Sequence, residues 1–252
     1  MKITIIGTGN VAHLLCRLAP QAGHQVVQVV GRDQAKADRL AEACSATAGT
    51  DPSVLEEAEI YIIAVTDAAI PEVAGRMHPY SGIVVHTGGS VALSAVSTCG
   101  LPCGVLWPLQ SIRANLDRIP EIPWVVDGSD EDTRDRLGVF AGTLSGKVGF
   151  ADDAQRRDLH LAAVHTSNFI NQLLVQAEAY CRGKGVDFSL LRPLITETVT
   201  RISEVPAIML RTGPSARGDM DTIGLHRRML QDRPDMLEVY DVMTRSILHH
   251  PG

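Results

Sequence analysis

Short apolar runs alternate with amphipathic stretches through the first half of the chain. The runs are nearly unbroken and rich in β-branched residues, as expected of strands that are buried on both faces of a parallel sheet. They fall at residues 2–6, 25–30, 60–65, 83–86, 105–106 and 124–126. Helical patterns fill residues 11–22, 33–44 and 68–77 between them. This alternation is typical of βαβ units, so we predict an α/β fold with a doubly wound, Rossmann-type parallel sheet.

The pattern changes in the second half of the chain. Residues 152–182 contain no Gly or Pro and keep apolar residues at helical spacing, which predicts one long helix. Two more helices are predicted over residues 187–204 and 221–231. We therefore expect a first domain over residues 1–150 and an all-helical second domain over residues 151–252.

The composition excludes several classes of function. The 252 residues suffice for two ordinary domains, with 45% hydrophobic and 21% charged residues. With a formal net charge of −6 and only 4% aromatic residues, the chain lacks the basic field and the stacking surfaces that bind nucleic acid. No apolar run reaches the roughly 18 residues that a membrane span requires. We therefore expect neither a nucleic-acid partner nor a membrane protein.

Five cysteines and the N-terminal segment bear on metals and on localisation. An odd number of cysteines, most of them inside helical or strand patterns, favours reduced thiols. Cys99 and Cys103 could pair or hold a metal, but no second Cys/His pair stands at zinc-finger spacing, so no metal site is predicted. Gly7, Gly9 and Asn10 interrupt any signal-peptide core, which predicts a cytoplasmic location.

A glycine-rich turn connects the first predicted strand to the first predicted helix. Its sequence has the Gly-x-Gly-x-x-Ala form of the dinucleotide fingerprint and consists of Gly7, Thr8, Gly9, Asn10, Val11 and Ala12. Gly7 would allow the tight turn, Gly9 would leave room for a pyrophosphate, and Ala12 would keep the helix close to the sheet. The alternative is a glycine turn that binds nothing. The position of the motif in a βαβ unit favours a nucleotide at the helix N-terminus.

The end of the second predicted strand indicates which nucleotide binds. An acidic residue at this point pairs with the ribose hydroxyls of NAD, whereas an arginine accommodates the 2′-phosphate of NADP. Gly31 stands where the acid would be expected, and Arg32 and Asp33 follow it. The sequence therefore predicts NADP(H) as cofactor. The alternative is that Arg32 is solvated and Asp33 is only a helix N-cap.

Polar residues follow three further predicted strands, at the edge where open α/β sheets bind ligands. We expect them to line the cofactor site, and they are Val65, Thr66, Asp67, His86, Thr87 and Pro108. Thr66 and Asp67 could instead cap a helix, and His86 could be structural. Gln110 offers amide hydrogen bonds to a substrate, although a plain turn would explain it equally well.

These motifs together resemble one known family. The resemblance is carried by residues 5–12, 64–67, 85–90, 107–111, 162–169 and 212–219. The whole chain resembles a bacterial family that joins a Rossmann-like domain to a C-terminal helical domain of unknown function. More distantly, it is similar to pyrroline-5-carboxylate reductase and to the 6-phosphogluconate dehydrogenase superfamily. These resemblances imply that NADP binds the first domain and that the helical domain forms a homodimer over the nicotinamide.

The predicted long helix carries the candidate proton donors. It lacks the lysine and asparagine pair of the related hydroxyacid dehydrogenases and has His160, His165 and Asn168 instead. His160 and Asn168 are related by two steps of four residues, and His165 and Asn168 by one step of three, so the three could face one cleft. Histidine suits proton transfer near neutral pH, with His165 the first choice and Asn168 holding an oxygen. The alternative is that both histidines are ordinary polar residues of the helix.

A loop between two predicted helices offers an anion-binding group. Arg217 could clamp a substrate carboxylate with two hydrogen bonds, and Asp219 stands beside it. The alternative is a helix-entry loop in which Asp219 or Asp221 is an N-cap and Arg217 is a solvated charge or an ion-pair partner.

The function that these residues favour is reduction by NADPH of a C=O or C=N bond. The substrate would be a small, anionic 2-oxo acid or cyclic imine, bound between the two domains of a homodimer. Two alternatives remain open: a catalytically silent NADP-binding sensor, and a Rossmann-type protein that uses flavin or S-adenosylmethionine.

Overall fold

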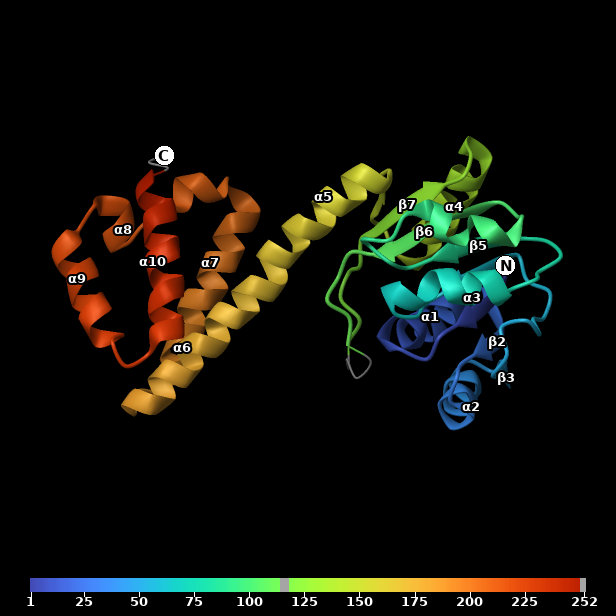
Figure 1. Cartoon of the computed structure of the whole chain (residues 1–252), viewed down its shortest axis with the longest axis horizontal. Coiled ribbons are helices and arrows are strands. Elements are labelled where there is room, and N and C mark those ends of the chain that lie inside the picture. Colours follow the sequence, from blue (N-terminus) through green and yellow to red (C-terminus); the bar gives the residue numbers. More distant parts are fainter. Residues whose placement is uncertain (114–117, 250–252) are drawn as a thin grey trace. The chain divides into compact units, whose positions relative to one another are not determined.

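The computed structural model describes residues 1–113 and 118–249. It divides the chain into two compact units, Met1–Asn168 and Phe169–Gly252. Figure 1 shows that the first unit holds the sheet and that the second is made of helices.

The first unit is built on one eight-stranded sheet with the strand order β3-β2-β1-β4-β5-β6-β7-β8. Its strands are β1 (Lys2–Ile6), β2 (Gln25–Val30), β3 (Thr47–Gly49), β4 (Ile60–Ile63), β5 (Ile83–His86), β6 (Cys103–Pro108), β7 (Trp124–Gly128) and β8 (Val148–Phe150). Neighbouring strands are parallel except for β6 and β7, which are antiparallel. The predicted α/β fold with a Rossmann-like parallel sheet is confirmed, whereas β3 and β8 were not predicted because each has only three residues.

Helices cover both faces of this sheet. The helices α1 (Asn10–Gln21), α2 (Gln34–Ala43) and α4 (Glu131–Leu144) share one apolar core with the sheet. On the other face, α3 (Ile70–Arg76) and the 3-10 helix η2 (Leu93–Cys99) form a second core. Successive residues of β4 alternate between the two cores and are all buried. Burial on both faces explains why the strands are unbroken apolar runs in the sequence.

The predicted long helix is present but contains a wide turn. It consists of α5 (Asp153–Ala163), a π-helical segment η3 (Val164–Phe169) and α6 (Ile170–Lys184). A capping box starts α5, in which Asp152 accepts from the Gln155 backbone N–H and Gln155 in turn accepts from that of Asp152. The first unit extends past the expected boundary at residue 150, because α5 packs on the sheet through buried Arg156.

The second unit contains more helices than the sequence predicted. After α6 come η4 (Phe188–Leu191), α7 (Arg192–Glu204), η5 (Ala207–Leu210), α8 (Pro214–Arg217), α9 (Met220–Met229) and α10 (Pro234–His249). Gly185, in the left-handed conformation, ends α6. The prediction omitted α8 and α10, although Pro234 at the first position of α10 is a typical start signal. No helix of the described residues is long and apolar enough to span a membrane.

Candidate functional site at the carboxyl ends of the strands

The fingerprint turn leaves the N-terminus of α1 open. Gly7 has φ +133°, and a Cβ atom there would collide with the carbonyl oxygen of Ala64, so only glycine fits the turn. Gly9 is the N-cap of α1 and makes no side-chain cap. No heavy atom lies within 4 Å of the position that a Cβ of Gly9 would take. The N–H groups of the first turn of α1 therefore face open space, which fits a pyrophosphate.

The other fingerprint residues hold α1 in place. Ala12 is fully buried against the sheet, as the motif requires. The side-chain amide of Asn10 donates to the carbonyl of Ile112 at 3.0 Å, which ties α1 to the segment after β6. Thr8 and Val11 flank the open turn and remain partly exposed.

Three consecutive residues after β2, Gly31, Arg32 and Asp33, have different roles. A Cβ on Gly31 would lie 2.5 Å from Cγ2 of Thr8, so this position has no room for an acidic side chain. Arg32 is exposed. Asp33 is the N-cap of α2 and accepts from the Lys36 backbone N–H at 3.1 Å. Asp33 therefore has a structural role, and Arg32 is the charged side chain here that remains available for a phosphate.

The residues after β4 and β5 are joined to one another. Ser90 Oγ donates to Asp67 Oδ2 at 2.8 Å. The Gly88 backbone N–H donates to Nδ1 of His86 at 3.1 Å, and Thr87 Oγ1 donates to the carbonyl of Ile63 at 3.5 Å. His86 is fully buried, and burial, together with the charge of Arg156, lowers its pKa to about 4. A neutral imidazole that accepts from the backbone fixes this turn and is not a proton donor near pH 7.

Val65 and Thr66 continue from β4 at the same edge. Thr66 occupies the N-cap position of a short 3-10 helix, Asp67–Ala69, without making a side-chain cap. The predicted cofactor residues after β4 and β5 thus lie together at one edge of the sheet, as parallel strands require.

His160 lies at the end of β6. Its ring packs on Trp107, with the ring centroids 5.7 Å apart and the planes at 44°. Gly89 lies against both rings, because a Cβ there would be 2.5 Å from Trp107 Cε2 and 2.8 Å from His160 Cδ2. Trp107 itself is buried on β6, next to Pro108. Gly89 follows a predicted strand and was expected at this edge of the sheet, whereas no site role was predicted for Trp107.

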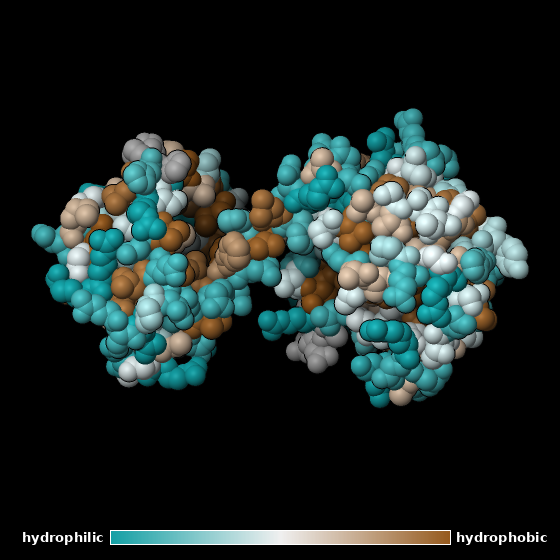
Figure 2. All heavy atoms as spheres, in the orientation of Figure 1, coloured by the Kyte–Doolittle hydropathy of each residue, from teal (hydrophilic) through white to brown (hydrophobic). Residues whose placement is uncertain are grey.

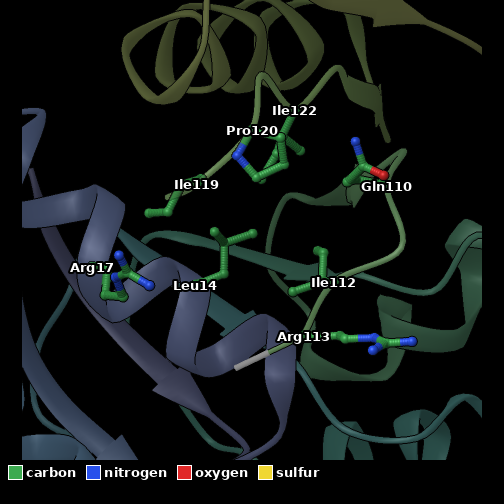
Figure 3. A pocket seen from close by; sticks show the side chains of 8 residues that line it. All are labelled: Leu14, Arg17, Gln110, Ile112, Arg113, Ile119, Pro120 and Ile122. Atoms are coloured by element: carbon green, nitrogen blue, oxygen red, sulfur yellow. The ribbon is translucent and has the colours of Figure 1, made fainter. Parts of the chain in front are cut away.

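Gln110 follows the carboxyl end of β6 by two residues. Figure 3 shows it in a narrow pocket where Leu14 and Arg17 of α1 lie opposite side chains of the segment between β6 and β7. Its Oε1 accepts from the Ser111 backbone N–H at 2.9 Å, which is the contact of an ordinary turn. Its predicted role in substrate binding stays a prediction.

The π-helical segment changes the relation between His160 and Asn168. On a continuous α-helix, eight residues at about 100° each would place Asn168 about 80° away from His160 around the axis. A π turn holds one extra residue and removes about 100° of this rotation, which leaves about 20°. His160 and Asn168 therefore lie nearly in line along the helix, whereas His165 lies within the exposed π-helical segment.

Arg217 and Asp219 belong to the second unit. Arg217 is the exposed last residue of α8. Asp219 is the N-cap of α9, where hydrogen bonds from the backbone N–H and the hydroxyl of Thr222, at 3.0 and 2.7 Å, lower its pKa. All the other candidate residues lie in the first unit, so a substrate site shared with Arg217 stays a prediction. The described residues contain no group of three side chains that could hold a metal ion.

Two family models match the chain. Residues 2–87 match the model of the NADP oxidoreductase, coenzyme F420-dependent, and residues 122–247 match that of the domain of unknown function DUF2520. The chain belongs to the DUF2520 family. The first match confirms that the Rossmann domain of this DUF2520 protein is of the NADP oxidoreductase type. A search of curated proteins finds no match.

Several solved structures have the same fold as this DUF2520 protein. A protein from Bacteroides fragilis, provisionally named an NADP oxidoreductase, is 33% identical, with a TM-score of 0.89 over 99% of this chain and 98% of that one. A pyrroline-5-carboxylate reductase from Streptococcus pyogenes is 14% identical, with a TM-score of 0.69 over 99% of both chains. A reductive aminase from Aspergillus terreus, in complex with NADPH and ethyl levulinate, is 18% identical, with a TM-score of 0.72 over 100% and 95%. The last two show a shared fold alone.

Proposed function

We propose that this DUF2520 protein is an NADP(H)-dependent oxidoreductase that reduces a C=O or C=N bond in a small anionic molecule. The observation that carries the proposal is the open, uncapped N-terminus of α1 at Gly9, beside an end of β2 that has Arg32 and no room for an acid at Gly31. The first feature fits a pyrophosphate and the second a 2′-phosphate.

The order of the strands indicates where hydride transfer would occur along the edge of the sheet. A dinucleotide whose 2′-phosphate pairs with Arg32 at the end of β2 would have its other half over the ends of β4, β5 and β6, beyond β1 in the strand order. When bound there, NADPH supplies a hydride to the carbon of the C=O or C=N bond. The heteroatom of that bond must gain a proton, and His160 is the histidine whose ring the structure places against Trp107 and Gly89 at this edge. Asn168, nearly in line with His160, would orient the heteroatom.

The substrate class is inferred from likeness of fold. Among the solved structures with this fold, one is a pyrroline-5-carboxylate reductase and another a reductive aminase. A cyclic imine that carries a carboxylate, or a 2-oxo acid, is therefore the class to test first. Arg217, exposed at the end of α8, would pair with the carboxylate.

The exposed apolar side chains of the second unit support a homodimer. Leu190 is 73% exposed, Met209 76% and Val199 60%, and Figure 2 shows hydrophobic side chains on the surface of this unit. We expect the contact to involve Leu173, Leu174, Ile195 and Val199, whose side chains are at least partly exposed in the single chain. A second copy would remove this surface from water. Light scattering at micromolar concentration should give twice the monomer mass of 27.1 kDa, and a monomer would contradict the proposal.

Two experiments test the proposed activity. Calorimetric titration of wild type and Gly9→Val with NADPH tests the cofactor site, because a branched side chain at Gly9 would occupy the space of the pyrophosphate while leaving the core intact. NADPH should then be mixed with a panel of 2-oxo acids and cyclic imines while the nicotinamide absorbance is followed. Binding to Gly9→Val as tight as to wild type would refute the cofactor site. NADPH binding without turnover of any panel member would favour a silent sensor.

A further inference from the structure

A guanidinium group is buried beneath the candidate site. Arg156 lies in α5, and only 1% of its side chain is exposed. Its Nη2 donates to the carbonyl of Val91 and to Asp153 Oδ1, both at 2.5 Å, and its Nη1 lies 3.7 Å from Asp127 Oδ2. Removing such a charge from water costs several kcal/mol, and a buried ion pair often stabilises a fold no better than apolar side chains of similar size. Stability alone is therefore a weak explanation for Arg156.

The two carboxyls beside Arg156 have shifted pKa values. Desolvation raises the pKa of Asp127, although the guanidinium opposes this shift. Burial also disfavours the charge of Asp153, but hydrogen bonds from the Leu93 backbone N–H and from Arg156 outweigh it and lower the pKa of this carboxyl. Asp153 therefore carries a negative charge that holds both Arg156 and the backbone of Leu93.

The contacts of this group meet at one short segment, residues 87–93, which we call the β5 loop. Besides the contact of Arg156 with Val91, Asp153 Oδ1 accepts from the Leu93 backbone N–H at 3.0 Å. Toward its other end, the loop is held by the hydrogen bond from Gly88 to His86 and by that from Ser90 to Asp67. The loop is thus anchored on both sides of Gly89.

Gly89 is the point at which the β5 loop touches the rings of Trp107 and His160. His160 follows Arg156 by four residues on α5, so the two side chains lie on the same face one turn apart. Arg156 therefore holds two parts of the site together. It donates a hydrogen bond to the β5 loop, and it belongs to the helix that carries His160.

We propose that Arg156 is a positioning residue that holds the β5 loop and the His160 turn of α5 in register at the nicotinamide half of the cofactor site. It is too deeply buried to touch a ligand and acts through the backbone of the β5 loop. The inference rests on the proposed NADP(H) function. It predicts that Arg156 matters for the nicotinamide half of the cofactor and not for the adenosine half, which lies over β1 and β2.

The test compares two ligands and three variants. NADPH spans both halves of the site, whereas adenosine 2′,5′-bisphosphate occupies only the adenosine half. Arg156→Met removes the guanidinium and keeps most of the side-chain volume, and Arg156→Lys keeps a positive charge but cannot reach two acceptors in a planar fork. Arg157→Met is the matched control, because Arg157 is the adjacent, exposed residue and its replacement removes the same positive charge. Thermal melts establish that each variant is folded.

In Arg156→Met, NADPH affinity should fall about tenfold, the effect of losing one ordinary hydrogen-bonding contact. The affinity for adenosine 2′,5′-bisphosphate should stay within about twofold of wild type. Without ligand, amide hydrogen exchange in residues 87–93 should become faster in Arg156→Met and remain unchanged in Arg157→Met. Arg156→Lys should show NADPH affinity and amide exchange between those of Arg156→Met and Arg157→Met. It replaces Arg156→Met in every comparison if Arg156→Met does not fold.

Other outcomes would overturn the inference. Equal weakening of both ligands would show a general structural role, and unchanged NADPH affinity together with unchanged exchange would show that Arg156 positions nothing. Failure of the proposed function is a different result, because wild type would then bind neither ligand.

Discussion

Replacing Arg32 with alanine should remove the preference for NADPH over NADH. Arg32 is exposed at the end of β2. Among the described residues it has no ion-pair partner, so its guanidinium is free to pair with a 2′-phosphate. Gly31 has no side chain that would repel this phosphate, and Asp33 is engaged as the N-cap of α2. The preference therefore depends mainly on one side chain.

The size of the effect follows from the exposure of Arg32. A hydrogen bond to a charged group contributes about 1.5–3 kcal/mol, and solvent screening at an exposed site reduces this to about 1–2 kcal/mol. Since 1.4 kcal/mol corresponds to about a factor of ten, NADPH affinity should fall about five- to thirtyfold in Arg32→Ala. NADH affinity should not change, because NADH lacks the 2′-phosphate.

Calorimetric titration of both cofactors against wild type and Arg32→Ala measures this difference. Arg39→Ala is the matched control, because Arg39 is an exposed arginine of α2 and its loss changes the net charge equally. The preference for NADPH should also shrink as salt is added, since the Debye length falls to about 8 Å at 0.15 M. Equal affinities of the wild type for NADPH and NADH would refute the reasoning, and so would an equal loss in Arg39→Ala.

Three further predictions concern the same edge of the sheet. Gly31→Asp should weaken NADPH binding without creating tight NADH binding, because its Cβ would lie 2.5 Å from Thr8 Cγ2. Calorimetry should show tight NADH binding only in the double variant with Thr8→Ala, and tight NADH binding by the single variant would contradict this. Once a substrate is found, His160→Ala should lower kcat by about 10²- to 10⁴-fold with little change in NADPH affinity; full activity of this variant combined with loss of activity in His165→Ala would move the donor to His165. Because folding lowers the pKa of His86 from 6.5 to about 4, protons bind preferentially to the unfolded chain below pH 6.5, and the free energy of unfolding should fall by about 3 kcal/mol between pH 6.5 and 4. Urea unfolding at several pH values should show a smaller fall for His86→Asn, and an equal fall would refute the assignment.

The sequence by itself determined the fold class and the cofactor end of the site. Strands buried on both faces must be continuous apolar runs, and the turn between β1 and α1 needs glycine where φ is positive, so both features are visible in local residue patterns. The match of residues 2–87 to the NADP oxidoreductase model confirms the type of this domain, whereas the individual cofactor residues stay predictions. The N-cap role of Asp33, and that of Asp219 or Asp221, were open as alternatives from the sequence, because capping is a contact between near neighbours along the chain; the structure shows Asp33 and Asp219 as N-caps.

The tertiary structure alone decided which residues meet at the other end of the site. The ion pair between Arg156 and Asp127 and the packing of Trp107 on His160 join residues that are 29 and 53 positions apart, and no local pattern encodes such pairings. The π-helical segment was equally invisible, because one extra residue per turn leaves the apolar spacing of a long helix nearly unchanged while it rotates everything that follows. Local sequence specifies turns, caps and buried runs, whereas the placement of His160, Arg156 and the β5 loop arises only when α5 packs against the folded sheet.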